Sequence, residues 1–171
     1  MKTAVLARLG ALTMGLLTAA AGIASPTGHS NSFRAALSGD VRAIIAGKAT
    51  FGRVSGGGAP DVFTLSLGTD SSRGAVLFTR PSGRELRIGS YTVSDIGHGS
   101  DVLQALVMLG RADRPEGVFR AQAGTLTITS VSHHLLTGHF VLDATGFLQS
   151  KPEREDRHVY ISGSLTARAD D

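Results

Sequence analysis

The chain of 171 residues contains no cysteine and no tryptophan. Without cysteine there is no disulfide framework, no thiol nucleophile, no cysteine-ligated zinc and no iron–sulfur cluster. Stability must therefore come from a hydrophobic core, which a chain of this length can build. The only tyrosines are Tyr91 and Tyr160, so the sequence supplies little material for an aromatic platform that stacks on sugars.

Charge is sparse and nearly balanced. Seventeen Lys and Arg residues stand against fourteen Asp and Glu residues, which gives a formal net charge of +3. No basic run is interleaved with aromatic residues, so we expect no nucleic-acid partner. The sequence has no Gly-x-Ser-x-Gly elbow, and the glycine-rich Ser55–Pro60 lacks the Lys-Ser/Thr ending of a phosphate loop. We expect no catalytic residues and no cofactor, and the sequence favours a protein without enzymatic activity.

The N-terminus has the order of a secretory signal peptide. Lys2 and Arg8 precede an uncharged stretch over 9–23, and small residues follow at the spacing of a cleavage site. We predict a signal peptide over 1–24, with cleavage after Ala24 or Ala21. The alternative is a membrane anchor, but the stretch is shorter than the roughly 20 residues that span a bilayer. Nothing later is apolar enough to span, so we expect an exported protein, periplasmic or extracellular, with no membrane span after cleavage.

Period-two alternation dominates the rest of the chain, broken by glycine-rich turns. The small polar residues 25–32 indicate a flexible leader, and 33–171 are predicted to form one antiparallel β domain, a sandwich or a barrel of about eight to nine strands. The clearest strand patterns place the following apolar residues on an inner face: Phe63, Leu65, Leu67, Leu126, Ile128, Phe140, Leu142, Ala144, Val159, Ile161, Leu165 and Ala167.

Residues 102–109 fit two patterns. They have apolar residues at helical spacing after Asp101, but the run is short and the following RADRPEG is good turn chemistry. We favour a strand over a helix here. The next two segments, Gly124–Ser132 and Thr137–Phe147, are predicted to pair as an antiparallel hairpin. In that register Ile128 faces Phe140, and the turn falls at about 132–136.

The C-terminal half resembles a group of small exported bacterial β-domains of unknown function. In these domains a strand of the form G-t-ϕ-t-I-t is followed by ϕ-ϕ-G-t-F-ϕ-ϕ-ϕ-A and V-x-ϕ-x-G-x-F-x-A, where ϕ is apolar. His139 and Leu165 stand where those domains have Thr and Phe. The resemblance implies an antiparallel β-sandwich or barrel of the cell envelope, and it implies no activity or site residues. The matching residues are Gly124, Ile128, Gly138, Phe140, Ala144, Gly163 and Ala167.

Histidine is concentrated in one stretch, SVSHHLLTGHF, which contains His133, His134 and His139. Adjacent residues of an extended chain point in different directions, so His133 and His134 lack the spacing that aims two ligands at one metal. In the predicted hairpin they lie at the turn, and His139 lies on the outer face opposite Thr129. A solvated hairpin end is therefore favoured over a metal site. His98, in SDIGHGSD, is a further weak candidate for a metal ligand.

Three hypotheses of function remain from the sequence. The leading one is a non-catalytic binding or structural module of the cell envelope, whose partner is a protein or a small apolar ligand. The second is a lipocalin-like carrier, in which a closed barrel holds a small molecule in an apolar cavity. The third is a metal-binding protein or metal-dependent enzyme that uses the histidines named above.

Overall fold

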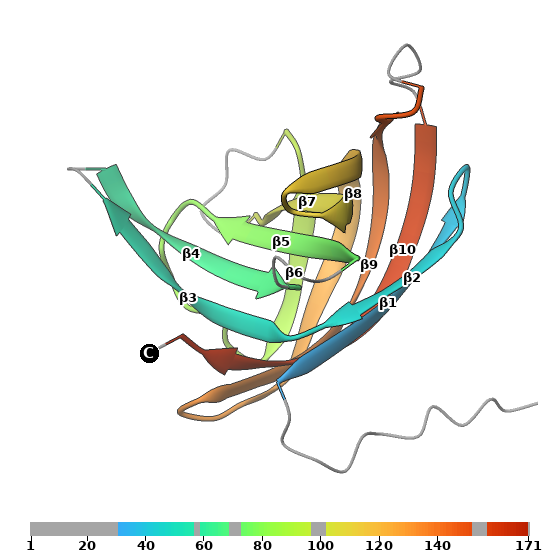
Figure 1. The fold of residues 1–171 in the computed structure, drawn as a ribbon. Coiled ribbons are helices and arrows are strands. Elements are labelled where there is room, and N and C mark those ends of the chain that lie inside the picture. The colour runs from blue at the N-terminus through green and yellow to red at the C-terminus, as the bar shows by residue number, and fades with distance from the viewer. Residues whose placement is uncertain (1–30, 57–58, 69–72, 97–101, 152–156, 171) are drawn as a thin grey trace, which may run out of the picture.

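The computed structural model describes residues 31–56, 59–68, 73–96, 102–151 and 157–170, and within them all regular structure is β-strand (Figure 1). In this part of the chain no helix has the length and apolar character that crossing a membrane requires. The predicted signal peptide and most of the predicted leader lie outside the described residues. The ten strands are β1 (Ser32–Gly39), β2 (Ala43–Gly47), β3 (Ala49–Gly56), β4 (Ala59–Leu67), β5 (Gly74–Arg80), β6 (Gly89–Ser94), β7 (Gln104–Arg111), β8 (Arg114–Val131), β9 (Leu135–Leu148) and β10 (Arg157–Ala169).

The strands form where apolar and polar residues alternate. In β5 every second side chain is buried and the others are half-buried, as a period of two requires. The predicted all-β, antiparallel class is confirmed, and so is the strand at 102–109, which is β7. Every inner-face residue that the patterns selected is buried.

The ten strands of the described residues differ from the expected eight to nine. The alternation over Val41–Val54 predicts one strand, but Lys48 interrupts it, because its two halves have different partners: β2 pairs with β1, and β3 pairs with β4 and β10. The alternation over Leu86–Ser94 likewise predicts a strand from Leu86, but this strand begins at Gly89. Its first residues instead form an irregular segment, which becomes important for the candidate site.

The strand pairing forms a circuit. The sheet runs in the order β2-β1-β10-β3-β4-β5-β7-β8-β6, and β9 joins β8 to β10. All the pairings between named strands are antiparallel except that of β10 with β3, which is parallel and consists of Arg168↔Thr50 and Ala169↔Phe51. This short link, and the branches β1, β2 and β6, distinguish the sheet from a clean barrel. Figure 1 shows β3, β4 and β5 curving across β9 and β10, so that the inner faces enclose the core.

The β8–β9 hairpin forms as predicted, but its predicted register is wrong by two residues. Ile128 pairs with Gly138, and Phe140 pairs with Leu126. The turn contributes one residue of this shift, since it is tighter than expected: the N–H of Ser132 donates to the carbonyl of Leu135 at 2.8 Å, and Val131 pairs with Leu136. A bulge between Ile128 and Ser130 contributes the other residue. Because the total shift is even, the same side chains still face the core.

The core is filled by large side chains from opposite parts of the sheet. Phe78 on β5 and Phe140 on β9 meet edge to face, with ring centroids 5.4 Å apart and an interplanar angle of 74°. Both rings are almost completely buried, as are Phe63 and Phe119. Such pairs add stabilisation beyond the burial of their area, and they occupy the space between the facing strands.

Candidate ligand-binding cleft

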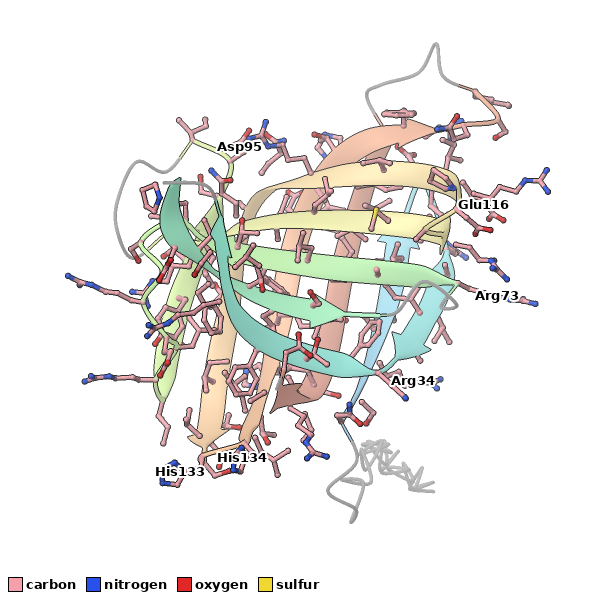
Figure 2. The ribbon with its side chains drawn as sticks, turned by 60° about the vertical axis from the view of Figure 1, so that its left-hand side comes forward. Arg34, Arg73, Asp95, Glu116, His133 and His134 are labelled. Carbon is pink, nitrogen blue, oxygen red and sulfur yellow. The ribbon has the colours of Figure 1, made fainter. Side chains whose placement is uncertain are left out.

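The structure separates the candidate histidines instead of gathering them. His133 and His134 lie at the β8–β9 turn, with ring centroids 6.3 Å apart, and both are exposed (Figure 2). His139 is exposed on the outer face of β9, where it pairs with Thr127 and not with the predicted Thr129. His98 lies outside the described residues. Within the described ranges, no group of three His, Cys, Asp or Glu side chains is placed to hold a metal ion.

A different histidine has a carboxylate partner. Nδ1 of His158 on β10 lies 3.5 Å from Oδ1 of Asp143 on β9, and both side chains are partly exposed. The backbone N–H of His158 also donates to the Asp40 carboxylate at 2.9 Å. These residues are distant in sequence, and only the β1–β10–β9 pairing brings them together. The Asp143–His158 pair links β9 to β10, and the Asp40 hydrogen bond ties the β1–β2 turn to β10, so these contacts have a structural role.

His133 belongs to a cleft of about 590 Å³, which we call the apolar cleft. Its floor consists of core side chains: Phe63, Leu86 and Leu136 are almost completely buried, and Phe51 is half-buried. The rings of Phe51 and Phe63 have centroids 6.2 Å apart. Its walls come from β3, the end of β10, the β8–β9 turn and the segment before β6. The complete lining is Phe51, Gly52, Arg53, Phe63, Glu85, Leu86, Val131, Ser132, His133, Leu136, Ala169 and Asp170.

The apolar cleft lies beside the short link in the sheet circuit. The end of β10 is held there by three backbone contacts: the parallel pairing with β3, a hydrogen bond from Asp170 N–H to the Phe51 carbonyl at 2.9 Å, and one from Ala169 N–H to the His134 carbonyl at 3.1 Å. Because β10 pairs with β3 through two residue pairs alone, the core side chains beside this link are not covered by a continuous ladder. The remaining opening is covered by irregular chain.

Residues 81–88, here called the cover segment, connect β5 to β6 across this opening. Leu86 inserts into the core, with 3% of its surface exposed. The segment begins with a turn at Gly83, whose N–H donates to the Arg80 carbonyl at 3.0 Å and whose φ is +64°. A Cβ atom at Gly83 would lie 2.5 Å from the Asp61 carbonyl oxygen, so this turn requires glycine.

Arg80 and Tyr91 hold the cover segment in place through hydrogen bonds to its backbone. Arg80 is 5% exposed, and its Nη1 donates to the carbonyls of Arg84 and Glu85 at 3.3 and 3.2 Å. Its guanidinium carbon lies 5.4 Å from the centroid of the Tyr91 ring. The Tyr91 hydroxyl accepts from the Arg87 N–H at 2.7 Å and donates to the Arg87 carbonyl at 3.0 Å. Burial of a charge is tolerated here because carbonyls and a ring face surround it.

A second cleft, which we call the arginine cleft, lies on the other side of the cover segment and has a volume of about 820 Å³. It shares Arg53, Glu85, Leu86 and Val131 with the apolar cleft. The one acidic side chain in its lining is Glu85, which forms an ion pair with Arg53 at 3.1 Å. Its complete lining is Arg53, Arg80, Arg84, Glu85, Leu86, Arg87, Tyr91 and Val131.

Two further clefts are less suited to a defined site. One lies along β4, β5 and β7 and is small, at about 180 Å³. The other, near Arg73 and Glu116, lies at the opposite end of β9 from His133, as Figure 2 shows. Its lining includes Arg73, which directly follows the range 69–72, and Ser150, which lies shortly before the range 152–156. The structure describes neither range.

Sequence reasoning selected only His133 among the residues of the apolar cleft, and it did so for a metal site. The run RPSGRE over 80–85 has the residues of a turn, and a turn gives no reason to treat its arginines as a group. A signal was present: Arg80, Arg84 and Arg87 fall within eight residues, with one acidic residue between them. A comparison of the chain with protein-family models, with curated proteins and with solved structures found no match.

Proposed function

We propose that the protein is a non-catalytic binding module of the bacterial cell envelope, which takes the apolar part of a small ligand into the apolar cleft. The observation that carries the proposal is a solvent-open cleft beside a short sheet link, whose floor is the half-buried ring of Phe51 and the buried core side chains Phe63 and Leu136 behind it. Small-molecule sites have volumes of roughly 300–1,000 Å³ and apolar walls with few polar groups. The apolar cleft, at about 590 Å³, lies within this range of volumes, and it combines an apolar floor with polar walls that carry Arg53, Glu85, Ser132, His133 and Asp170.

The packing inside the sheet supports binding in the apolar cleft over binding in a central cavity, as a lipocalin-like carrier would require. Phe78 and Phe140 are in edge-to-face contact between the facing strands, where a lipocalin-like ligand would need empty space. The described clefts are open to solvent and lie at the rim of the sheet. The envelope location rests on the signal-peptide pattern. N-terminal sequencing of the exported protein should find a start at Gly22 or Ser25, and a start at Met1 would contradict export with cleavage.

The ligand proposal is tested with N-phenyl-1-naphthylamine, an uncharged apolar probe whose emission rises when it leaves water. We expect saturable binding at one site on the mature protein. Val131 lines both clefts and is 42% exposed, so Val131→Trp introduces a bulky side chain at the cleft without displacing the core. This variant should bind the probe at least about tenfold more weakly, a loss of about 1.4 kcal/mol.

The matched control is Val141→Trp. Val141 is 54% exposed on the outer face of β9 and lines none of the described clefts. Since the natural chain has no tryptophan, each variant also carries a single fluorescent reporter. The probe should quench or shift the emission of Trp at 131 and leave that at 141 unchanged. Equal binding to both variants, or no saturable binding to the natural chain, would overturn the proposal.

A further inference from the structure

The charge of the arginine cleft is strongly one-sided. Four arginines line it, and Glu85 is the single acid among its lining residues. Glu85 is already paired with Arg53. Arg80 is turned inward onto two carbonyls and the Tyr91 ring. A cleft with this balance attracts anions, because like charges gathered on low-dielectric walls focus the positive potential.

Arg84 and Arg87 differ from Arg53, which is paired with Glu85, and from Arg80, which is buried. Both residues are exposed, and their backbone atoms contact other described residues: the Arg84 carbonyl accepts from Arg80, and the Arg87 N–H and carbonyl contact the Tyr91 hydroxyl. Their backbone is thus fixed while their guanidinium groups extend from it. Arginine forks match carboxylate and phosphate groups bidentately, which makes this pair suited to an anionic head group.

The two clefts adjoin along Glu85 and Leu86. They share Arg53, Glu85, Leu86 and Val131, so a ligand that reaches from one to the other passes over the Arg53–Glu85 pair. One side offers the half-buried ring of Phe51 and the exposed Val131 above buried core side chains, and the other offers arginines. A molecule that satisfies both sides has an apolar tail and an anionic head.

We infer that the ligand is an amphiphile with a carboxylate or phosphate head group held by Arg84 and Arg87, and that the Glu85 carboxylate competes with this head group for Arg53. The inference rests on the proposed function, since the tail occupies the apolar cleft. The Arg53 and Glu85 side chains are 50% and 68% exposed. Exposed ion pairs of this kind are weak, so an incoming anion can replace Glu85 at Arg53.

The experiment measures displacement of N-phenyl-1-naphthylamine from the mature protein by four ligands with the same tail, the three ionic ones below their micelle concentrations and the alcohol below its solubility limit. These are dodecanoate, dodecyl phosphate, dodecanol and dodecyltrimethylammonium. Acetate and inorganic phosphate provide the two anionic heads without a tail. We expect dodecanoate and dodecyl phosphate to bind about tenfold or more tightly than dodecanol, with dodecyltrimethylammonium weakest, since hydrogen bonds to charged groups are the stronger class.

Variants test the residues separately. Arg84→Gln and Arg87→Gln together should weaken dodecanoate binding by about tenfold and leave dodecanol binding unchanged. The matched control is Arg34→Gln with Arg120→Gln, which removes the same charge from exposed residues that line none of the described clefts. Glu85→Gln should act in the opposite direction and tighten dodecanoate binding by about two- to fivefold, because the competing charge is gone.

The outcomes separate this inference from the proposed function. If the probe binds and all four tailed ligands displace it equally, the binding module stands and the anionic head group is overturned. If acetate or phosphate binds as tightly as its dodecyl counterpart, the amphiphile is overturned. If Glu85→Gln weakens dodecanoate as much as the arginine variants do, competition by Glu85 is overturned. Failure of the probe to bind at all is the failure of the proposed function.

Discussion

Phe140 on β9 lies against Gly163 on β10, its direct partner in the sheet, and a Cβ atom at Gly163 would lie 2.7 Å from Cζ of Phe140. The same Cβ would lie 2.7 Å from the Arg34 carbonyl oxygen. The ring therefore fills the space that the glycine leaves, and it reaches Phe78 on the opposite part of the sheet. One glycine thereby permits the aromatic contact that joins β9 to β5 through the core.

We expect Gly163→Ala to destabilise the fold by about 1–3 kcal/mol, because the neighbours of the new methyl group are backbone and a packed ring. The control is Gly52→Ala in β3, where the nearest atom to the new Cβ is Asp170 Cβ at 3.6 Å. That variant should be neutral or slightly stabilising, since glycine in a strand carries an entropic cost. Urea unfolding measures both, and equal effects would contradict the close approach at Gly163.

Phe140→Ala should lower the free energy of unfolding by about 3–5 kcal/mol, since it removes a buried ring and leaves a cavity beside Phe78. Val141→Ala, the adjacent residue on the outer face, should change it by less than about 0.5 kcal/mol. Denaturant unfolding monitored by circular dichroism gives both values. A cost below about 1 kcal/mol for Phe140→Ala would mean that this side of β9 does not face the core.

Tyr91→Phe tests how the cover segment is held. The change removes the hydroxyl that accepts from the Arg87 N–H and donates to its carbonyl, and it keeps the ring beneath Arg80. We expect a loss of about 0.5–1.5 kcal/mol, and faster amide hydrogen exchange within 84–88. Tyr160→Phe is the control, because Tyr160 is 55% exposed on β10. If exchange in the cover segment rose equally in both variants, the Tyr91 contacts would not be what holds it.

Zinc should leave the melting temperature almost unchanged. A metal that binds the folded state alone stabilises it by mass action, but His133 and His134 have rings 6.3 Å apart and His139 lies on the outer face of β9. Differential scanning calorimetry with and without excess zinc checks this. A rise of several degrees that vanishes when all three histidines become alanine, and persists in His158→Ala, would instead establish a metal site.

The sequence by itself determined the all-β class and, in the clearest strands, which side chains face inward. A period of two is a local property of the chain, so Phe63, Leu65 and Leu67, or Val159 and Ile161, could be assigned to the core without any knowledge of their partners. The shortness of the run and the turn chemistry after it favoured a strand over a helix at 102–109.

The tertiary structure decided which strands pair with one another and in which register. The bulge after Ile128 and the tight turn at Ser132 shift the β8–β9 pairing by two residues, and neither changes the alternation that the sequence displays. The break at Lys48 likewise follows from β1 lying between β2 and β10. Hydrogen-bond pairing depends on the neighbouring strand, which a pattern along one strand does not contain.

The candidate site also belongs to the tertiary structure. Phe51, Leu86 and Leu136 come from distant parts of the chain and line one cleft beside the short parallel link between β10 and β3. Leu86 matched the alternation of a strand, yet it lies in irregular chain that covers this opening. The opening lies where the pairing of β10 with β3 ends. The end of this pairing depends on how all the strands of the circuit are arranged, and no single segment of the sequence contains that information.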